Sequence, residues 1–308
     1  MLDLSIIIVN YNTHDRLRDC LRSVYASGGD FAFEVWVVDN ASTDGSAAMV
    51  REEFPQAQLI ESPVNGGYAY ANNLGLRAAG FDPQTSDPRP QPPKYALLLN
   101  PDTVLPPRAL AEMLAFMEVH PEAGAAGPKL VLADGRLDLA CRRSFPTPEV
   151  AFYRLVGLSK LFPRSRRFAR YNLTYLDPDE EAEVDSVVGA FMMVRGEAIQ
   201  QVGLLDERFF LYGEDLDWAL RLKEAGWKIY YNPRVAVLHY KREATRHSSR
   251  ARYEFYRAMY LFYRKHYAAQ TPFWLHWIIL GGIALRGGTA MMKEILTSKA
   301  KMPMEAVK

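Results

Sequence analysis

The sequence predicts an α/β protein with a mostly parallel, Rossmann-like sheet and a helical C-terminal extension. Short apolar segments alternate with helical segments through the first 120 residues, which is typical of parallel strands joined by right-handed crossovers. Hydrophobic residues make up 49% of the 308 residues and charged residues 24%, which is enough apolar material for a sizeable core. Polar residues come directly after the apolar segments. These positions are the carboxyl ends of the expected strands, where a sheet of this kind binds its ligand.

The first half of the chain contains four such strand–helix units. Strands are expected at 4–10, 33–39, 57–62 and 95–99, and helices over 14–26, 42–54, 68–79 and 107–118. Ser42 or Thr43 is the expected N-cap of the second helix, because a hydroxyl can accept a hydrogen bond from a free helical N–H. Residues 80–94 contain too many prolines for regular structure and are expected to form a surface insertion.

The second half is less regular. Residues 141–183 contain an arginine cluster and most of an acidic run, and we expect a variable insertion with solvated faces. Order returns over 184–240 with a β-rich segment, a helix beginning near Asp215, and closing strands in "WKIYYNP" and "VAVLHY". Acidic residues at the start of that helix and basic residues near its end suit the helix dipole.

The C-terminal segment differs from the rest in charge. Residues 241–308 contain thirteen Lys/Arg and four Asp/Glu, a net charge of +9, whereas the first 240 residues carry −8. An aromatic, arginine-edged helix is expected first, and the apolar segment 273–285 follows it. Thirteen residues are too few to span a bilayer, but Trp274, Trp277 and nearby cations suit a helix in the headgroup layer. We therefore expect membrane-surface contact through 250–297; the alternatives are a helical cap on the preceding α/β domain and a homodimer interface.

Other features of the sequence point to a reducing compartment. The two cysteines, Cys20 and Cys141, supply neither a disulfide framework nor a zinc pattern. The N-terminus "MLDLSIIIVNYN" has no basic region and reads as a first strand, not as a signal peptide. We expect a cytoplasmic protein, on the inner face of the cell membrane if the tail binds lipid, with no nucleic-acid partner.

Amide or carboxylate side chains follow each of the first four expected strands. They are Asn10, Tyr11 and Asn12; Asp39 and Asn40; Asn65, Gly66 and Gly67; and Asn100, Pro101 and Asp102. Such residues are also common in turns, but four sets at one edge of a sheet predict a ligand site there.

Three acidic residues and one histidine are candidates for a catalytic or metal-binding role. One of Glu214, Asp215 and Asp217 could act as a general base, although helix capping would explain one or two of them. His239 ends an apolar strand and could share Mg²⁺ or Mn²⁺ with Asp102, with substrate phosphates and water as further ligands; a satisfied core or edge histidine is the alternative.

Seven segments together carry a family resemblance. They are "SIIIVNYN", "VVDNASTDGS", "NGGYAYANN", "LLLNPD", "VVGAFMMVRGEAI", "FFLYGEDLDWALRLKEAGW" and "VLHY". In order and spacing, the chain over residues 3–240 resembles the inverting family 2 glycosyltransferases of the GT-A fold, and most closely their rhamnosyltransferase-like branch. The resemblance implies a catalytic domain over 1–240, with nucleotide-sugar binding in 1–120 and acceptor binding and catalysis in 121–240, followed by the extension 241–308.

The resemblance also implies roles for individual residues. Asn10, Tyr11, Asn12 and Asp39 would hold the nucleobase and ribose, and Asn65 and Gly67 would line the same pocket. Asp102 takes the metal-binding place of the family's Asp-x-Asp motif, with His239 as a second ligand, while Asn100 stands in the first acidic place. This is a departure, because an amide can hydrogen-bond but contributes no charge. Asp215 resembles the catalytic base, and Glu214, Asp217 and Trp218 are expected on the acceptor side.

The implied reaction is transfer of a sugar from a nucleotide donor to a hydroxyl of a glycan or lipid-linked glycan, with inversion. Branch resemblance favours dTDP-L-rhamnose as donor, and UDP-sugars next. A sugar-phosphate nucleotidyltransferase is the alternative enzyme, but it needs a Gly-rich basic loop that "NYNTHDR" lacks. A catalytically inactive sugar-binding scaffold is the other alternative. No Gly-x-Gly-x-x-Gly follows the first strand, which argues against a dinucleotide-binding dehydrogenase.

Overall fold

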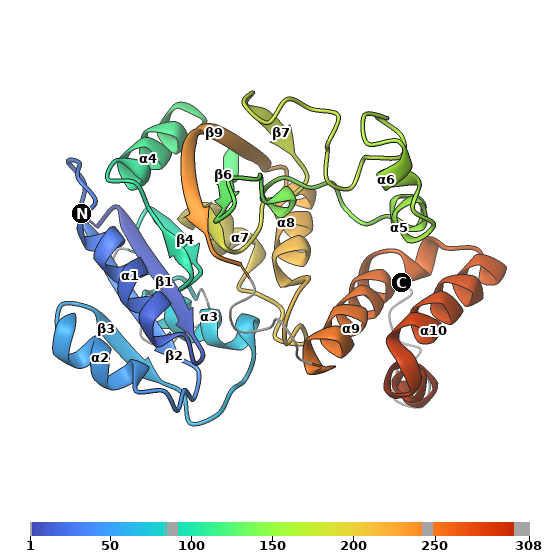
Figure 1. Cartoon of the computed structure of the whole chain (residues 1–308), viewed down its shortest axis with the longest axis horizontal. Coiled ribbons are helices and arrows are strands. Elements are labelled where there is room, and N and C mark those ends of the chain that lie inside the picture. The colour runs from blue at the N-terminus through green and yellow to red at the C-terminus, as the bar shows by residue number, and fades with distance from the viewer. Residues whose placement is uncertain (1, 83, 85–91, 242–248, 299–308) are drawn as a thin grey trace.

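The structure is a computed structural model that describes residues 2–82, 84, 92–241 and 249–298 (Figure 1). Part of the expected surface insertion and residues 242–248 and 299–308 of the extension lie outside the described residues. The strands are β1 Leu4–Asn10, β2 Phe33–Asp39, β3 Gln58–Glu61, β4 Tyr95–Leu99, β5 Thr103–Val104, β6 Ala123–Leu132, β7 Ala182–Val184, β8 Phe191–Arg195 and β9 Lys228–His239. The helices are α1 His14–Tyr25, α2 Ser46–Glu53, α3 Tyr68–Ala78, α4 Ala109–Val119, α5 Pro148–Leu155, α6 Leu158–Leu161, α7 Gly196–Val202, α8 Glu214–Glu224, α9 Ser249–His266 and α10 Phe273–Ser298, with short 3₁₀ turns at Leu139–Cys141 and Ala268–Gln270.

The strands form one mixed, mostly parallel sheet in the order β3-β2-β1-β4-β8-β6-β9-β5, and β7 pairs with β9. β1 to β4 are parallel, and β8 is antiparallel to β4 and β6. All residues of β1, β4 and β8 are buried, as expected for strands covered on both faces. The predicted α/β fold class and the positions of the first four strands are confirmed.

The register of the parallel strands gathers the polar residues at one edge. Asn10 of β1 lies opposite Asp39 of β2, and β4 ends at Leu99 beside Ile8 of β1. Helix α3 packs closely on the middle of β1 because its Gly75 has no side chain. A Cβ at Gly75 would lie 2.6 Å from a methyl carbon of Ile7.

Two predicted boundaries were wrong. Helix α2 begins at Ser46 after Gly45, not at Ser42 or Thr43. Ser42 instead bonds to the loop after β1, so its hydroxyl is used across the sheet edge and not for capping. The two closing strands are one long strand, β9, whose register against β6 shifts between Asn232 and Ala236.

The C-terminal extension is helical, as predicted, and α9 lies between α8 and α10 (Figure 1). Phe209, Leu216, Ala258 and Phe262 pack together where α9 meets α8. A second apolar cluster joins α9 and α10 and contains Tyr260, Tyr263, Leu280, Ile283, Ala284, Met291 and Ile295. The aromatic side of α9 is therefore used for packing within the protein.

A buried carboxylate fastens α9 to α8. The side chain of Asp217 is fully buried, and its Oδ1 lies 2.6 Å from Lys265 Nζ and 2.7 Å from His266 Nε2. Its Oδ2 accepts a 3.0 Å hydrogen bond from Arg221 Nε. Lys265 also pairs with Asp206 at 2.7 Å. The carboxylate of Asp217 thus neutralises cations from two helices.

We expect Asp217→Ala to lower the free energy of unfolding by about 3 kcal/mol, because it removes the buried carboxylate that Arg221, Lys265 and His266 share. Urea denaturation measures the change, and Asp217→Asn tests the charge with little change in volume. Glu112→Ala is the control, because it removes only an exposed Arg108–Glu112 pair and should shift stability by less than about 0.5 kcal/mol. Equal stability of the Asp217 variants and the control would contradict this anchoring role.

Candidate functional site

The ends of β1 and β2 are joined by buried hydrogen bonds. Asn10 Nδ2 donates to Asp39 Oδ1 and to Ser42 Oγ, both at 3.0 Å. The second carboxylate oxygen of Asp39 accepts from the Ser42 N–H at 2.9 Å. Asn10 therefore supports Asp39, and the structure brings these two predicted site residues together.

The loop after β1 has a strained, well-connected turn. Asn12 has φ 53°, and its Oδ1 accepts a 2.8 Å hydrogen bond from the Thr43 N–H. Tyr11 is 42% exposed beside it. A polar cavity of about 510 Å³ lies against this loop and is lined by Asn12, Thr13, His14, Asp15, Arg16 and Asp44. Polar groups thus face open space at this end of the site.

Asn65 and Gly67 lie at the next strand end, in a turn built by amide hydrogen bonds. Asn40 Nδ2 donates to Asn65 Oδ1 at 3.0 Å, and the same oxygen accepts from the Gly67 N–H at 3.1 Å. Gly67 has φ 90°, and a Cβ there would lie 2.4 Å from the carbonyl oxygen of Phe210. Glycine is therefore required for this close approach. Asn40, for which no individual role was predicted, is the side chain that holds the turn together.

The loop after β4 places Asp102 next to His239. Thr103 of β5 pairs with His239 of β9, and the Asp102 carbonyl oxygen accepts from the Tyr240 N–H at 2.9 Å. Asp102 Oδ1 consequently lies 3.4 Å from His239 Nε2. Pairing of β5 with β9 thus brings together the two predicted metal ligands, which are far apart in the sequence.

A second carboxylate, missed in the sequence, orients His239. Asp138 is buried, and its Oδ2 lies 2.9 Å from His239 Nδ1 while its Oδ1 pairs with Lys241. Burial alone would lower the pKa of His239, but its hydrogen bonds to Asp102 and Asp138 raise the pKa to about 9. Burial would raise the pKa of Asp138, and its bonds from His239 and Lys241 instead hold that pKa well below its usual range. Nothing in the local sequence singles out Asp138.

Asp102 and His239 could hold a divalent cation that takes the place of the proton on His239 Nε2. One carboxylate oxygen and one imidazole nitrogen face each other, and the other ring nitrogen is held by a carboxylate, as is usual for metal-binding histidines. Within the described ranges, no group of three or more His, Cys, Asp or Glu side chains could hold a metal. Asp102 and His239 would thus leave most coordination positions to other ligands.

Asp215 lies in the first turn of α8 and is held by groups from two other segments. Its Oδ2 accepts from Arg143 Nη2 at 2.7 Å and from the Gly189 N–H at 3.0 Å. Burial alone would lower the pKa of Arg143, and the Asp215 carboxylate reverses this, so that pKa lies above its usual range. Neither Arg143 nor Gly189 was predicted from the sequence as a site residue, because both contacts depend on the tertiary fold.

The segment Gly189–Ala190 links Asp215 to the loop after β4. Gly189 donates its N–H to Asp215, and the next carbonyl, of Ala190, accepts from the Asn100 N–H at 3.0 Å. Tyr68 donates its hydroxyl to the Gly189 carbonyl at 2.8 Å. Burial and the nearby charges of Glu214, Asp215 and Asp102 raise the pKa of Tyr68. The expected base and the expected metal ligand therefore lie near one another, on two sides of a single peptide segment.

The residues expected on the acceptor side separate into two groups. Glu214 is buried, and its Oε2 has no hydrogen-bond partner in the described part of the chain. Burial and the Asp215 charge raise the pKa of Glu214 to about 8. Trp218 is fully buried and donates its indole N–H to the Gly203 carbonyl, and Asp217 anchors α9. The placement of Asp217 and Trp218 does not support the acceptor role expected for them, because both point into helix packing.

Comparisons with known proteins place the chain among the glycosyltransferases. Two family models match: "Glycosyl transferase family 2" over residues 5–139 and "Glycosyl transferase family group 2" over residues 95–292. An N-acetylglucosaminyl-diphospho-decaprenol L-rhamnosyltransferase of Mycobacterium tuberculosis is 27% identical over 299 residues, covering 97% of this chain and 96% of the relative. Rhamnosyltransferase WbbL of Escherichia coli K12 is 24% identical over 76% of this chain and 82% of its own. The mannosyltransferase PcManGT of Pyrobaculum calidifontis, solved with GDP-Man and Mn²⁺, superimposes with a TM-score of 0.54 at 17% identity, covering 96% of this chain and 79% of its own.

The raised pKa of Glu214 predicts a pH-dependent loss of stability. Between its unfolded pKa of 4.5 and its folded pKa of about 8, the folded protein binds more protons at this site than the unfolded chain. The free energy of unfolding should therefore fall as pH rises through this window, by up to about 1.4 kcal/mol per pH unit. Glu214→Gln should remove this part of the dependence and be the more stable protein at pH 8.

Thermal unfolding at pH 5, 6.5 and 8 measures this effect. Glu197→Gln, at another helix start, is the control and should follow the wild type. Parallel pH profiles for Glu214→Gln and the wild type would contradict a raised pKa at Glu214.

Proposed function

This chain belongs to glycosyltransferase family 2, an inverting family that uses a nucleotide-sugar donor, and we propose that it transfers L-rhamnose from dTDP-L-rhamnose to a hydroxyl of a lipid-linked glycan. Support for rhamnose comes from the full-length similarity to a relative named as an L-rhamnosyltransferase and from the similarity to rhamnosyltransferase WbbL. The name of the first relative also supplies the acceptor class, a sugar on a diphospho-prenol. Polysaccharide or cell-wall synthesis is the corresponding role.

The observation that carries the proposed chemistry is the link through Gly189–Ala190. It holds Asp215 and the Asn100–Asp102 loop on two sides of one segment. In a donor bound between them, the anomeric carbon would lie near the Asn100–Asp102 loop. The face of the sugar that the acceptor attacks would be turned toward Asp215. This is the arrangement that a single displacement with inversion requires, because the acceptor must attack from the face opposite the leaving group.

The donor is proposed to lie along the polar edge of the sheet. Asp39, supported by Asn10, would accept hydrogen bonds from the nucleobase or ribose. Tyr11 and Asn12 border the open polar end of the edge. Asn65 and Gly67 form the adjoining turn. Asn100 has a half-buried side chain for which no hydrogen bond is found in the described part of the chain, so its amide would bond to the donor without adding charge.

Asp102 and His239 would hold a divalent cation, Mg²⁺ or Mn²⁺, together with the donor diphosphate. When bound, such a cation stabilises the negative charge that develops on the departing nucleoside diphosphate. Asp138 would keep the His239 ring oriented with Nε2 toward the site.

Asp215 is the proposed general base for the acceptor hydroxyl. Arg143 and the Gly189 N–H fix one carboxylate oxygen at 2.7 and 3.0 Å, which holds the carboxylate in one orientation. Glu214, with an unpaired buried oxygen beside it, is the residue to which the base is reassigned if Asp215 proves dispensable.

The reaction is tested by measuring nucleoside diphosphate release over a panel of dTDP-, UDP- and GDP-sugars with a prenyl-diphosphate-linked sugar as acceptor. We expect the fastest turnover with dTDP-L-rhamnose and an inverted anomeric configuration in the product. Pyrophosphate release would indicate a nucleotidyltransferase instead, and binding without any turnover would indicate a sugar-binding scaffold.

Two variants separate the roles in this assay. Asp215→Asn should lower kcat by at least about a thousandfold with nearly unchanged donor binding, because a base acts in the transition state. Asp102→Ala should instead weaken metal-dependent donor binding by about tenfold or more, measured by calorimetry with and without Mn²⁺. Wild-type kcat in Asp215→Asn would move the base to Glu214.

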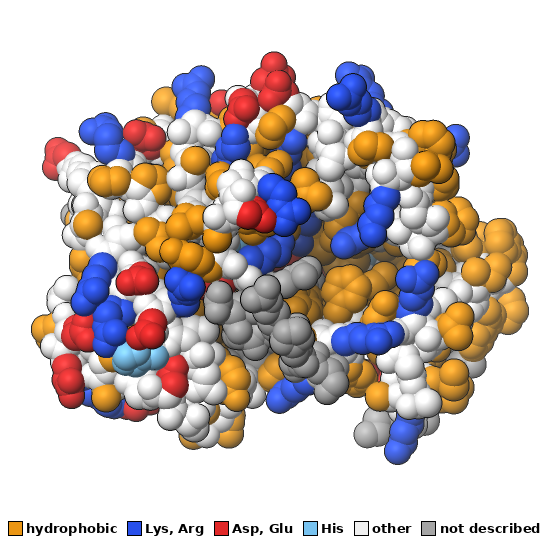
Figure 2. Space-filling model, viewed as in Figure 1, with side chains coloured by type: hydrophobic (Ala, Val, Ile, Leu, Met, Phe, Trp, Pro, Cys, Tyr) orange, Lys and Arg blue, Asp and Glu red, His pale blue; other side chains and the backbone are white. Residues whose placement is uncertain are grey.

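We also propose that the protein attaches to the cytoplasmic membrane surface through the outer face of α10. None of the helices in the described ranges has both the length and the apolar character needed to cross a bilayer. Five large apolar side chains in the first part of α10 are nevertheless exposed: Phe273, Trp274, Trp277, Ile278 and Leu285. Figure 2 shows hydrophobic side chains at this end of the molecule and Lys and Arg side chains nearby. Amphipathic tryptophans with flanking cations suit the headgroup region, whereas the inner face of α10 packs on α9.

Liposome co-sedimentation tests this attachment. Binding should rise with anionic lipid and fall with salt, because each Lys or Arg near such a surface contributes about 1 kcal/mol. Trp274→Asp/Ile278→Asp should reduce binding by tenfold or more. Val119→Asp, at an exposed apolar position at the end of α4, is the matched control. Wild-type protein that stays in the supernatant, or that forms a dimer through this face, would refute membrane attachment.

A further inference from the structure

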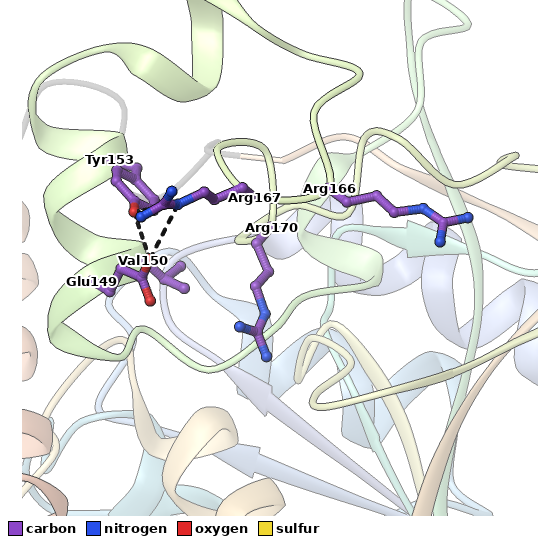
Figure 3. A pocket seen from close by; sticks show the side chains of 6 residues that line it. All are labelled: Glu149, Val150, Tyr153, Arg166, Arg167 and Arg170. Carbon is purple, nitrogen blue, oxygen red and sulfur yellow. Dashed lines mark hydrogen bonds and ion pairs between the residues drawn. The ribbon is translucent and has the colours of Figure 1, made fainter.

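A pocket of about 330 Å³ lies in the insertion between β6 and β7 (Figure 3). Its lining residues come from α5 and from the loop that follows α6: Glu149, Val150, Tyr153, Arg166, Arg167 and Arg170. We name this the arginine pocket. The sequence indicated only a solvated basic cluster here, and the proposed reaction does not use it.

The charges of the arginine pocket are not balanced internally. Arg167 Nε donates to the Tyr153 hydroxyl at 2.8 Å and lies 3.6 Å from Glu149 Oε1. Arg166 and Arg170 extend away from this pair in Figure 3, and their side chains make no hydrogen bond or ion pair within the described part of the chain. Three guanidinium groups and one carboxylate thus leave a net charge of about +2, a setting that suits a phosphate group.

The arginine pocket is connected to the proposed base through a short path. Arg170 precedes Tyr171, whose carbonyl oxygen accepts a 2.9 Å hydrogen bond from the Ser144 N–H. Ser144 follows Arg143, whose guanidinium binds Asp215. Two peptide steps and one backbone pairing place the Cα atoms of Arg170 and Arg143 within about 15 Å. The arginine pocket is therefore joined to the segment that positions Asp215.

Exposed apolar side chains continue from the arginine pocket. On α5, α6 and their flanking residues they are Phe152, Leu155, Val156, Leu161 and Phe162. The Leu155 carbonyl accepts a 3.4 Å hydrogen bond from Arg286 of α10, and Figure 1 shows α5 and α6 on the same side of the molecule as α10. The apolar surface of the insertion therefore adjoins the helix that we propose to contact the membrane.

We propose that the arginine pocket binds the phosphate groups of the lipid-linked acceptor, so that the diphosphate is held between Asp215 and the apolar surface of α5, α6 and α10. This inference rests on the proposed function, since it assumes such an acceptor. The order along the protein is base, arginines and apolar side chains, and the order along the acceptor is reacting hydroxyl, diphosphate and lipid. Arg166 and Arg170 contribute the unpaired guanidinium groups, and Arg167 is held in place by Tyr153.

The test compares two acceptors that carry the same sugar, one on a short prenyl diphosphate and one on a neutral alkyl chain, both in uncharged detergent micelles. For Arg166→Ala/Arg170→Ala we expect KM for the diphosphate acceptor to rise about tenfold to a hundredfold, the effect of losing one or two charge-assisted hydrogen bonds. KM for the neutral acceptor and for the donor should not change. Arg164→Ala, an exposed arginine of the same segment outside the pocket, is the matched control.

The outcomes separate this inference from the proposed function. If the wild type transfers sugar to both acceptors and the double variant changes KM for neither or for both equally, the pocket inference is wrong and the proposed function stands. If the wild type transfers sugar to neither, the proposed function is wrong and the inference fails with it. A third arm measures binding to anionic vesicles without acceptor. Loss of vesicle binding with an unchanged KM for the diphosphate acceptor would assign the pocket to a lipid headgroup and overturn the inference.

Discussion

The proposed site depends on the peptide segment Gly189–Ala190 immediately before β8. The N–H of Gly189 binds the Asp215 carboxylate, and the carbonyl of Ala190 binds the N–H of Asn100. Because β8 also pairs with β4 along its length, this segment cannot move without disturbing the centre of the sheet. A buried, fully paired strand therefore sets the separation between the proposed base and the proposed metal loop, as a reaction with little tolerance for misalignment requires.

Buried carboxylates, each held by a cation from a distant segment, recur around this centre. Arg143 holds Asp215, His239 and Lys241 hold Asp138, and Lys265 and His266 hold Asp217. A buried ion pair gives little net stability, but losing one partner is costly because a charge is left without compensation. These pairs therefore act as constraints on position. They couple the insertion and helix α9 to helix α8, and strand β9 to the segment that follows β6.

The insertion between β6 and β7 and the C-terminal extension lie together in space. The insertion that carries α5 and α6 and the extension that carries α9 and α10 meet on one side of the molecule (Figure 1), with Arg286 bonded to the end of α5. The polar edge proposed for the donor, at the ends of β1 and β2, lies at the other end of the sheet. A donor site on the parallel strands and an acceptor side built from insertion and extension would let one scaffold accept different acceptors by changing only the second part.

The sequence by itself determined the fold class, the first four strands and the polar residues at their ends, because hydrophobic periodicity and strand ends are local patterns. The family resemblance pointed to Asp102, His239 and Asp215 as a set. The tertiary structure alone decided what supports them: Arg143 reaches Asp215 across 72 residues and Asp138 reaches His239 across 101. It also shows that Asp217 and Trp218 are buried between packed segments, and that Ser42 bonds to the end of β1 and does not cap a helix. A carboxylate or hydroxyl has the same local pattern whether it binds substrate or another helix, and only the position of its partners in the folded chain distinguishes the two.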